Sequence, residues 1–208
     1  MDQSKTQMAI YFHGSSVLFD RFDLSHSFEG AGRAKFGFGV YVTEEYATAA
    51  HYAYSDKRPD NRDFYVYTVE IPDRTEENCL PLYKRVPVPE SIVTRTEERL
   101  GEALPPEAKA EGIPFRKYLA NRLTGVNGTV TQMTGKATVE RERAAASFLL
   151  SIGVELIEWP QGSWTNPKKR NMAVLDDSRI RIIRIDKVDL TGKDHHLVPG
   201  SQRLIKGF

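Results

Sequence analysis

Glycine interrupts two short runs of aromatic and β-branched residues, and this constrains the fold more than any other feature of the sequence. The first run is YFHGS at residues 11–15, and the second is FGFGVYVT at residues 36–43. Aromatic and β-branched residues favour β-strands, whereas a glycine inside a strand allows a close approach to the backbone. We therefore expect two strands whose backbone a ligand can approach closely.

Composition points to one globular domain without a strong overall charge. Of 208 residues, 40% are hydrophobic and 27% are charged, with 29 basic against 28 acidic side chains. No global field therefore directs the chain to nucleic acid or membrane. Cys79 has no second cysteine to pair with, which favours a reducing compartment, and we interpret it as a buried small hydrophobe.

No segment has the features of a secretory signal or a membrane span. The N-terminus lacks the apolar core of a signal, and no apolar run approaches the roughly 20 residues that cross a bilayer. We expect a soluble cytoplasmic protein without a membrane partner, which a signal-independent route could still deliver into a target cell.

Short strands and helices alternate without regular βαβ units, which predicts an α+β fold. The expected strands are 8–12, 39–43, 64–71, 155–159, 171–175 and 180–185. The expected helices are 43–54 with Thr43 as N-cap, 89–103, 114–124, and 138–152 with Gly153 as C-cap. We expect one domain at 1–190, with a helical insertion at about 73–136 on one side of the sheet, and a loosely ordered tail at 191–208.

His13, Gly14 and Ser15 follow directly on the first predicted strand. A glycine there leaves its N–H and C=O open to a carboxamide, while an imidazole and a hydroxyl can bind ribose hydroxyls. The other interpretation of His13 is a structural histidine. The second run lacks the third glycine and the preceding βα unit of a dinucleotide fingerprint, which excludes Rossmann-type binding.

The order of three segments resembles the ADP-ribosyltransferases of the diphtheria-toxin and poly(ADP-ribose) polymerase type. The segments are HGS at 13–15, FGFGVY at 36–41 and ATAAHYA at 47–53. The resemblance implies two small mixed or antiparallel sheets split around an NAD cleft. It also implies that His13 holds the adenosine ribose, that Gly14 clamps the nicotinamide amide, and that Tyr41 and Tyr52 sandwich the nicotinamide ring. Ser15 would lie at the ribose or amide edge, and Gly39 would complete the cofactor-binding set.

The C-terminal third resembles the end of ADP-ribosyltransferase domains in polyvalent proteins of phages and mobile elements. The matching segments are AASFLLSIGV at 145–154, LIEW at 156–159 and RNMAVLDD at 170–177, and the whole resemblance covers roughly 8–85 and 134–185. It implies a bacterial toxin or phage-conflict effector that uses NAD without a metal, with an antitoxin or immunity protein as a further partner.

Two positions depart from the better-known enzymes. Asn171 stands where the polymerases carry glutamate; asparagine keeps a hydrogen bond but supplies no negative charge and no base. This argues against polymer elongation and leaves mono-ADP-ribosyl transfer to a reactive acceptor, or a carboxylate recruited from elsewhere. Glu158 and its neighbour Glu155 are the candidates for such a carboxylate. The alternative is that both are solvated strand residues. Ala49 replaces a serine that donates to the amide, so nicotinamide would be held less tightly.

Residues 160–170 occupy the position of the loop that recognises the acceptor in this family. The candidate acceptor-loop residues are Gln161, Trp164, Lys168, Lys169 and Arg170. An aromatic side chain beside basic ones can stack on a base and neutralise phosphates, or can belong to an ordinary exposed loop. The acceptor therefore stays open between protein and RNA or DNA. His195 and His196 lack further ligands at metal spacing and are interpreted as part of a solvated tail.

The leading hypothesis is a mono-ADP-ribosyltransferase in which His13, Tyr41, Asn171 and Glu158 carry the reaction. Its alternatives are an NAD glycohydrolase with water as acceptor, and an inactive module that binds NAD or ADP-ribose. A further alternative is an interaction domain whose working surface is the helical stretch 73–136.

Overall fold

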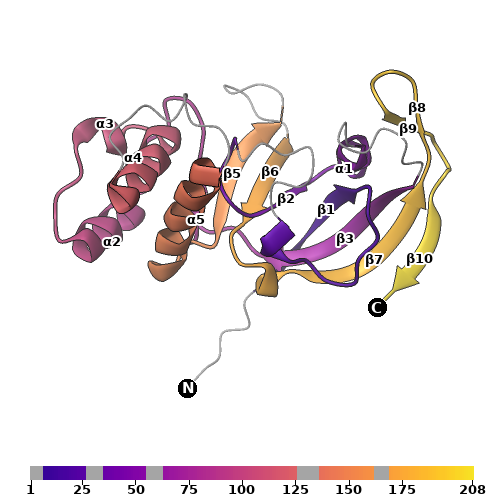
Figure 1. The fold of residues 1–208 in the computed structure, drawn as a ribbon, viewed down its shortest axis with the longest axis horizontal. Helices are drawn as coiled ribbons and strands as arrows, with labels where there is room; N and C mark the ends of the chain where they lie inside the picture. Colours follow the sequence, from indigo (N-terminus) through magenta and orange to yellow (C-terminus); the bar gives the residue numbers. More distant parts are fainter. Residues whose placement is uncertain (1–6, 27–34, 55–62, 126–135, 162–168) are drawn as a thin grey trace. The chain divides into compact units, whose positions relative to one another are not determined.

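The computed structural model describes residues 7–26, 35–54, 63–125, 136–161 and 169–208 (Figure 1). The chain is α+β, as the sequence predicts, and its main β-structure has eight strands of mixed orientation. By internal contacts it divides into two compact units. The first comprises Met1–Arg33, Val40–Asp73 and Asp176–Phe208, and the second comprises Ala34–Gly39 and Arg74–Leu175.

The first unit is built on five antiparallel strands in the order β10-β7-β3-β1-β2. Their bounds are Met8–Ser15 for β1, Val40–Thr43 for β2, Phe64–Pro72 for β3, Arg181–Val188 for β7 and Arg203–Gly207 for β10. The unit also contains a small hairpin, β8 (Leu190–Thr191) with β9 (His196–Leu197), and two short 3₁₀ helices at Leu24–His26 and Asp177–Arg179. The strand β3 lies in the middle of this order, and its aromatic and β-branched residues are buried along almost its whole length.

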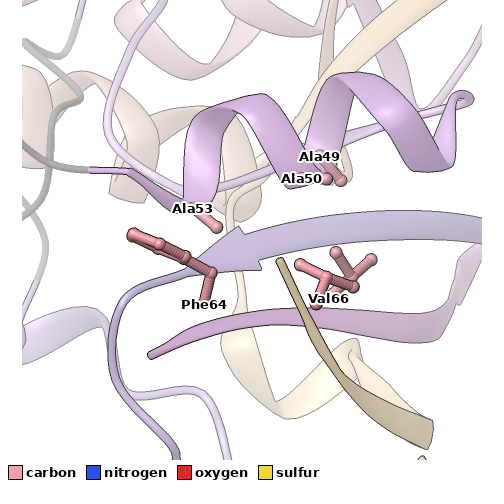
Figure 2. Packing of buried hydrophobic residues seen from close by; sticks show 6 residues of the cluster. Ala49, Ala50, Ala53, Phe64 and Val66 are labelled. Atoms are coloured by element: carbon pink, nitrogen blue, oxygen red, sulfur yellow. The ribbon is translucent and has the colours of Figure 1, made fainter. Parts of the chain in front are cut away.

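Helix α1 (Tyr46–Ala53) covers one face of these strands. Figure 2 shows the side chains of Ala49, Ala50 and Ala53 directed from the helix toward Phe64 and Val66. The small side chains let the helix backbone approach the sheet closely. At Gly14 on β1 the approach is so close that an added Cβ would lie 1.8 Å from the carbonyl oxygen of Ala49. Gly14 is therefore required by the packing of α1.

The described part of the second unit combines three strands with four helices (Figure 1). β5 (Leu156–Gln161) pairs antiparallel with β6 (Lys169–Val174) and parallel with the short β4 (Cys79–Pro81). The helices are α2 (Glu90–Leu100), α3 (Pro106–Lys109), α4 (Gly112–Thr124) and α5 (Lys136–Ser151). α4 and α5 lie side by side, and buried residues such as Phe115, Leu119 and Leu149 supply their core.

The segment 35–39, which holds the first part of the second glycine-interrupted run, packs inside this unit. Phe36 stacks on Trp159 with ring centroids 4.4 Å apart, and Phe38 is buried under the guanidinium of Arg143. Gly37 has φ +116°, a conformation that favours glycine. A Cβ on Gly39 would lie 2.8 Å from the carbonyl oxygen of Val174. Both glycines are thus explained by local packing.

The predicted strands and helices are confirmed, with small differences at their ends. Gly153, with φ +82°, follows α5 as expected of a residue that ends a helix. The N-cap prediction was wrong, because the N-cap of α1 is Glu45 and Thr43 is the last residue of β2. The Thr43 hydroxyl instead accepts a hydrogen bond from the Glu45 backbone N–H at 3.4 Å. Two residues, Glu44 and Glu45, therefore separate the end of β2 from the start of α1.

Two other differences have physical reasons. β4, which falls inside the stretch expected to be helical, has only three residues and gains its strand pairing from β5. The tail at 191–208 forms β9 and β10 rather than a loosely ordered segment. Every residue of β10 is exposed, so no hydrophobic period marks it, and its pairing with β7 and the Arg203–Asp189 ion pair hold it in place. Among the described residues, no helix is long and apolar enough to cross a membrane.

We predict that Gly14→Ala destabilises the protein by about 3 kcal/mol, because the new methyl group would collide with the backbone of α1. Gly207→Ala is the matched control: Gly207 also lies in a strand, but its added Cβ would meet nothing within 4 Å, so its effect should stay within about 0.5 kcal/mol. Urea unfolding of both variants measures the difference. Equal stabilities would show that α1 does not lie as close to β1 as described.

Candidate functional site

His13 lies near the end of β1, opposite Tyr67 of β3. Its Nδ1 is 2.7 Å from the backbone carbonyl oxygen of Tyr41, in the neighbouring strand β2. A carbonyl oxygen can only accept, so Nδ1 carries the proton, and in the neutral ring Nε2 is then an acceptor. The tautomer of His13 is thus set by β2, and Nε2 is left as a hydrogen-bond acceptor.

Aromatic rings surround the half-buried imidazole. Phe22 meets the His13 ring edge to face at 5.0 Å, while Phe19 and Tyr67 lie 6.2 and 6.1 Å away. This environment lowers the pKa of His13 below its ordinary value, because desolvation disfavours the imidazolium and outweighs the hydrogen bond to Tyr41. His13 is therefore neutral at physiological pH.

Tyr67 anchors the loop that brings these rings to His13. Its hydroxyl donates to the carbonyl oxygen of Val17 at 3.0 Å and accepts from the Phe19 N–H at 2.8 Å, and its ring stacks on Phe19 at 4.3 Å. Burial raises the pKa of Tyr67, so it stays a neutral donor. Sequence reasoning missed Phe19, Phe22 and Tyr67; the spacing of two phenylalanines inside an otherwise polar loop was the available signal.

Gly14 and Ser15 complete the predicted triplet at the end of β1. β1 and β2 pair in register only at Phe12 and Thr43, so their ladder does not continue alongside Gly14. The Ser15 hydroxyl accepts a hydrogen bond from the Val17 N–H at 3.0 Å, which starts the loop after the strand. The roles of Gly14 at an amide and of Ser15 at a ribose stay predictions.

The two tyrosines predicted to hold the nicotinamide ring both belong to the first unit. Tyr41 is half-buried in β2, and Tyr52 lies in the last turn of α1 with 58% of its surface exposed. The Tyr52 ring contacts His51 edge to face at 5.3 Å. Since α1 passes directly over Gly14 at Ala49 and Ala53, Tyr52 extends from the helix that covers this strand end. The sandwich itself stays a prediction.

Asn171 and Glu158 belong to the second unit, on neighbouring strands. Asn171 pairs with Trp159 and Glu158 pairs with Met172, and consecutive residues of a strand point to opposite faces. Asn171 therefore shares a face with Ile157, Trp159 and Ala173, whereas Glu158 points to the other face. The structure does not bring these two side chains together, so Glu158 does not replace the carboxylate that Asn171 lacks.

Glu158 is buried, with 2% of its side chain exposed, so its interpretation as a solvated residue was wrong. One carboxylate oxygen lies 2.8 Å from Nε of Arg74 and 3.7 Å from Nη1 of Arg170. Tyr83 also hydrogen-bonds Glu158, and desolvation together with this carboxylate raises the pKa of Tyr83. Burial raises the pKa of Cys79 nearby to about 12, so its thiol is not a nucleophile. Glu158 is the centre of a structural ion-pair cluster.

The predicted acceptor loop is described only at its two ends. Trp164 and Lys168 lie outside the described residues. Gln161 and Lys169 pair with each other in register and therefore share the face of Asn171, whereas Arg170 turns to the other face and to Glu158. The candidate residues thus divide between two faces of the β5–β6 hairpin.

The predicted site residues divide between the two units. The first unit holds His13, Gly14, Ser15, Tyr41 and Tyr52, and the second holds Gly39, Glu158, Gln161, Lys169, Arg170 and Asn171. That both groups serve one NAD cleft stays a prediction. Within the described ranges, no group of three or more His, Cys, Asp or Glu side chains is placed to hold a metal ion. No protein-family model, curated protein or solved structure matches the chain.

We predict that His13 makes the protein less stable in mild acid. Its pKa lies below the ordinary histidine value of 6.5 only in the folded state, so the unfolded chain binds more protons, and stability falls as the pH drops below the unfolded pKa. His13→Asn places an amide where Nδ1 donates and removes this titration. Urea midpoints measured from about pH 7.5 to about pH 5.0 should fall less steeply in the variant than in the wild type. Equal slopes would contradict the assignment.

We predict that Glu158→Gln lowers stability by about 2 kcal/mol, the size expected when the group bound by Tyr83 loses its charge beside two arginines. The loss is limited because Arg74 and Arg170 are partly exposed and can stay hydrated. Glu98→Gln, at an exposed position of α2, is the control and should change stability by less than about 0.5 kcal/mol. Chemical denaturation distinguishes them, and a Glu158→Gln protein as stable as the control would show that the cluster is not structural.

Proposed function

We propose that this protein is a mono-ADP-ribosyltransferase that cleaves NAD and transfers ADP-ribose to a macromolecular acceptor. The observation that carries the proposal is the state of His13: a neutral imidazole at a strand end, with Nδ1 bound to Tyr41 and Nε2 able to accept. A neutral acceptor of this kind suits a ribose hydroxyl, which donates its proton. An imidazolium would instead have two donors.

The remaining roles follow the same proposal. Gly14 would bind the nicotinamide amide through its backbone, and the exposed ring of Tyr52 would stack on the nicotinamide with Tyr41 on the other side. Asn171 would orient the nicotinamide ribose by a hydrogen bond. The bond between C1′ and the nicotinamide nitrogen breaks, and its electron pair leaves with neutral nicotinamide. A nucleophile of the acceptor then forms the new bond to C1′ and loses its proton to solvent.

On this proposal the helical stretch of the second unit is an insertion in an NAD-binding fold. Gln161, Lys169 and the neighbouring loop residues would meet the acceptor, which is protein, RNA or DNA. By the same resemblance we propose a role as a bacterial toxin or phage-conflict effector in the cytoplasm, with an antitoxin or immunity protein as partner.

One observation favours a second candidate, a module that binds NAD or ADP-ribose without turning it over. The face of the β5–β6 hairpin that carries Asn171 has no carboxylate among its described residues, which are Ile157, Trp159, Gln161, Lys169 and Ala173. A developing positive charge on the sugar would lack the stabilisation that a carboxylate gives.

Incubation with NAD labelled on its adenylate phosphate distinguishes these functions. We expect label on a macromolecule in cell extract, and separate digestion with protease and nuclease identifies its class. His13→Ala should lower kcat/KM about 10- to 100-fold through the lost hydrogen bond, and Tyr52→Ala about 3- to 10-fold through lost stacking. His196→Ala, an exposed position outside the site, is the control.

Each other outcome identifies a different function. Binding of the label without any product would support the non-catalytic module. Free ADP-ribose without a labelled macromolecule would identify an NAD glycohydrolase. If calorimetry detects no binding of NAD to a folded protein, both the transferase and the module are wrong.

A further inference from the structure

Three charged side chains are buried in the second unit. Arg116 on α4 and Arg141 and Glu142 on α5 are each no more than 4% exposed. Nη1 of Arg116 forms an ion pair with Glu142, and its Nη2 donates to the backbone carbonyl oxygen of Lys35 at 2.9 Å. Arg141 directly precedes Glu142 on α5, but adjacent residues of a helix do not face each other. Glu142 is thus the ion-pair partner of Arg116, and Arg141 is a second buried cation of this unit.

Arg141 has no acceptor. Among the residues that the structure describes, none of its three guanidinium nitrogens has a hydrogen-bond partner, and Nε of Arg116 has none either. Buried polar side-chain groups in proteins are usually hydrogen-bonded, and a buried charge without a partner is strongly unfavourable. The buried charge of Arg141 and its unmatched donors indicate that a negatively charged group belongs beside it.

The position of Arg141 on its helix shows that its burial is part of the fold. Ala145 and Leu149 follow at four-residue intervals, on the same side of α5, and both are buried. The glycine-interrupted segment lies close by, since a Cβ added to Gly37 would be 3.4 Å from Cδ of Arg116. Arg116 thus contacts both α5, through Glu142, and the segment that carries Lys35 and Gly37.

We propose that Arg141 binds a phosphate-type oxyanion. A guanidinium presents paired N–H donors whose geometry matches two oxygens of a phosphate or similar oxyanion. With so little of Arg141 exposed, the ligand is a small ion or a single phosphoryl group rather than the surface of a macromolecule. The site is independent of the NAD chemistry proposed above, because it uses none of the same residues.

Thermal unfolding of the full chain tests the site, with inorganic phosphate added against chloride at constant pH and ionic strength. A ligand at a hundred times its Kd should raise the wild-type Tm by roughly 5–10 °C. Arg141→Met removes the charge but keeps an apolar stem. In chloride this variant should be at least as stable as the wild type, because it no longer buries an unmatched cation, and phosphate should not stabilise it specifically.

Arg99→Met is the matched control, since Arg99 is an exposed residue of the same unit; it should respond to phosphate as the wild type does. If all three proteins gain equally, phosphate acts only through its general effect on hydration, and the proposal is wrong. The proposal is also wrong if phosphate does not raise the Tm of the wild type, which is the result expected if water molecules accept the hydrogen bonds of the Arg141 guanidinium. Should Arg141→Met fail to fold, phosphate titration of the wild type by calorimetry decides, and no binding overturns the site.

The same assay identifies the source of the phosphoryl group. If ADP-ribose stabilises the wild type but not Arg141→Met and competes with phosphate, the group belongs to a dinucleotide. If phosphate stabilises the protein and ADP-ribose neither competes nor depends on Arg141, the ligand is a free ion. Failure of both ligands to act through Arg141 removes the site without affecting the role proposed for His13.

Discussion

The close approach of helix α1 to strand β1 at Gly14 is the contact on which the first unit depends. The alanines of α1 bring its backbone against the sheet, and only a residue without a side chain fits beneath it. The opposite side of the helix is held by the β8–β9 hairpin. There Nδ1 of His51 hydrogen-bonds the carbonyl oxygen of Asp194 at 2.7 Å, and Tyr54 stacks on His195 at 3.5 Å. Because α1 is held between strand and hairpin, the backbone of Tyr52 has a fixed position in the helix that covers Gly14.

The two glycine-interrupted runs meet different packing demands. In the first run, Gly14 admits a helix; in the second, Gly37 and Gly39 admit a side chain and a strand of the second unit. The same signal in a sequence therefore indicates close backbone approach without naming what approaches. A ligand-binding role for these glycines has to be compatible with packing that already occupies one side of each.

Much of the fold could be predicted because its elements carry strong local patterns. β3 is aromatic and β-branched, and α5 has an apolar face with Gly153 at its end. β10 could not be predicted, because an edge strand with every side chain exposed has no hydrophobic period. For the site, His13 and its strand followed from sequence, whereas the burial of Glu158 did not. Its arginine partner Arg74 is distant in sequence, so no short motif joins the two.

The face that carries Asn171 determines what chemistry the proposed transferase could perform. With Glu158 on the opposite face and bound by two arginines, the β5–β6 hairpin offers asparagine, glutamine and lysine where better-known enzymes offer a carboxylate. A positive sugar would then gain little stabilisation from this hairpin, and Lys169 would oppose it. On the proposed function, an acceptor with its own negative charge compensates best. A carboxylate or a terminal phosphate would supply both the nucleophile and the counter-charge, whereas a neutral hydroxyl would supply neither without a base.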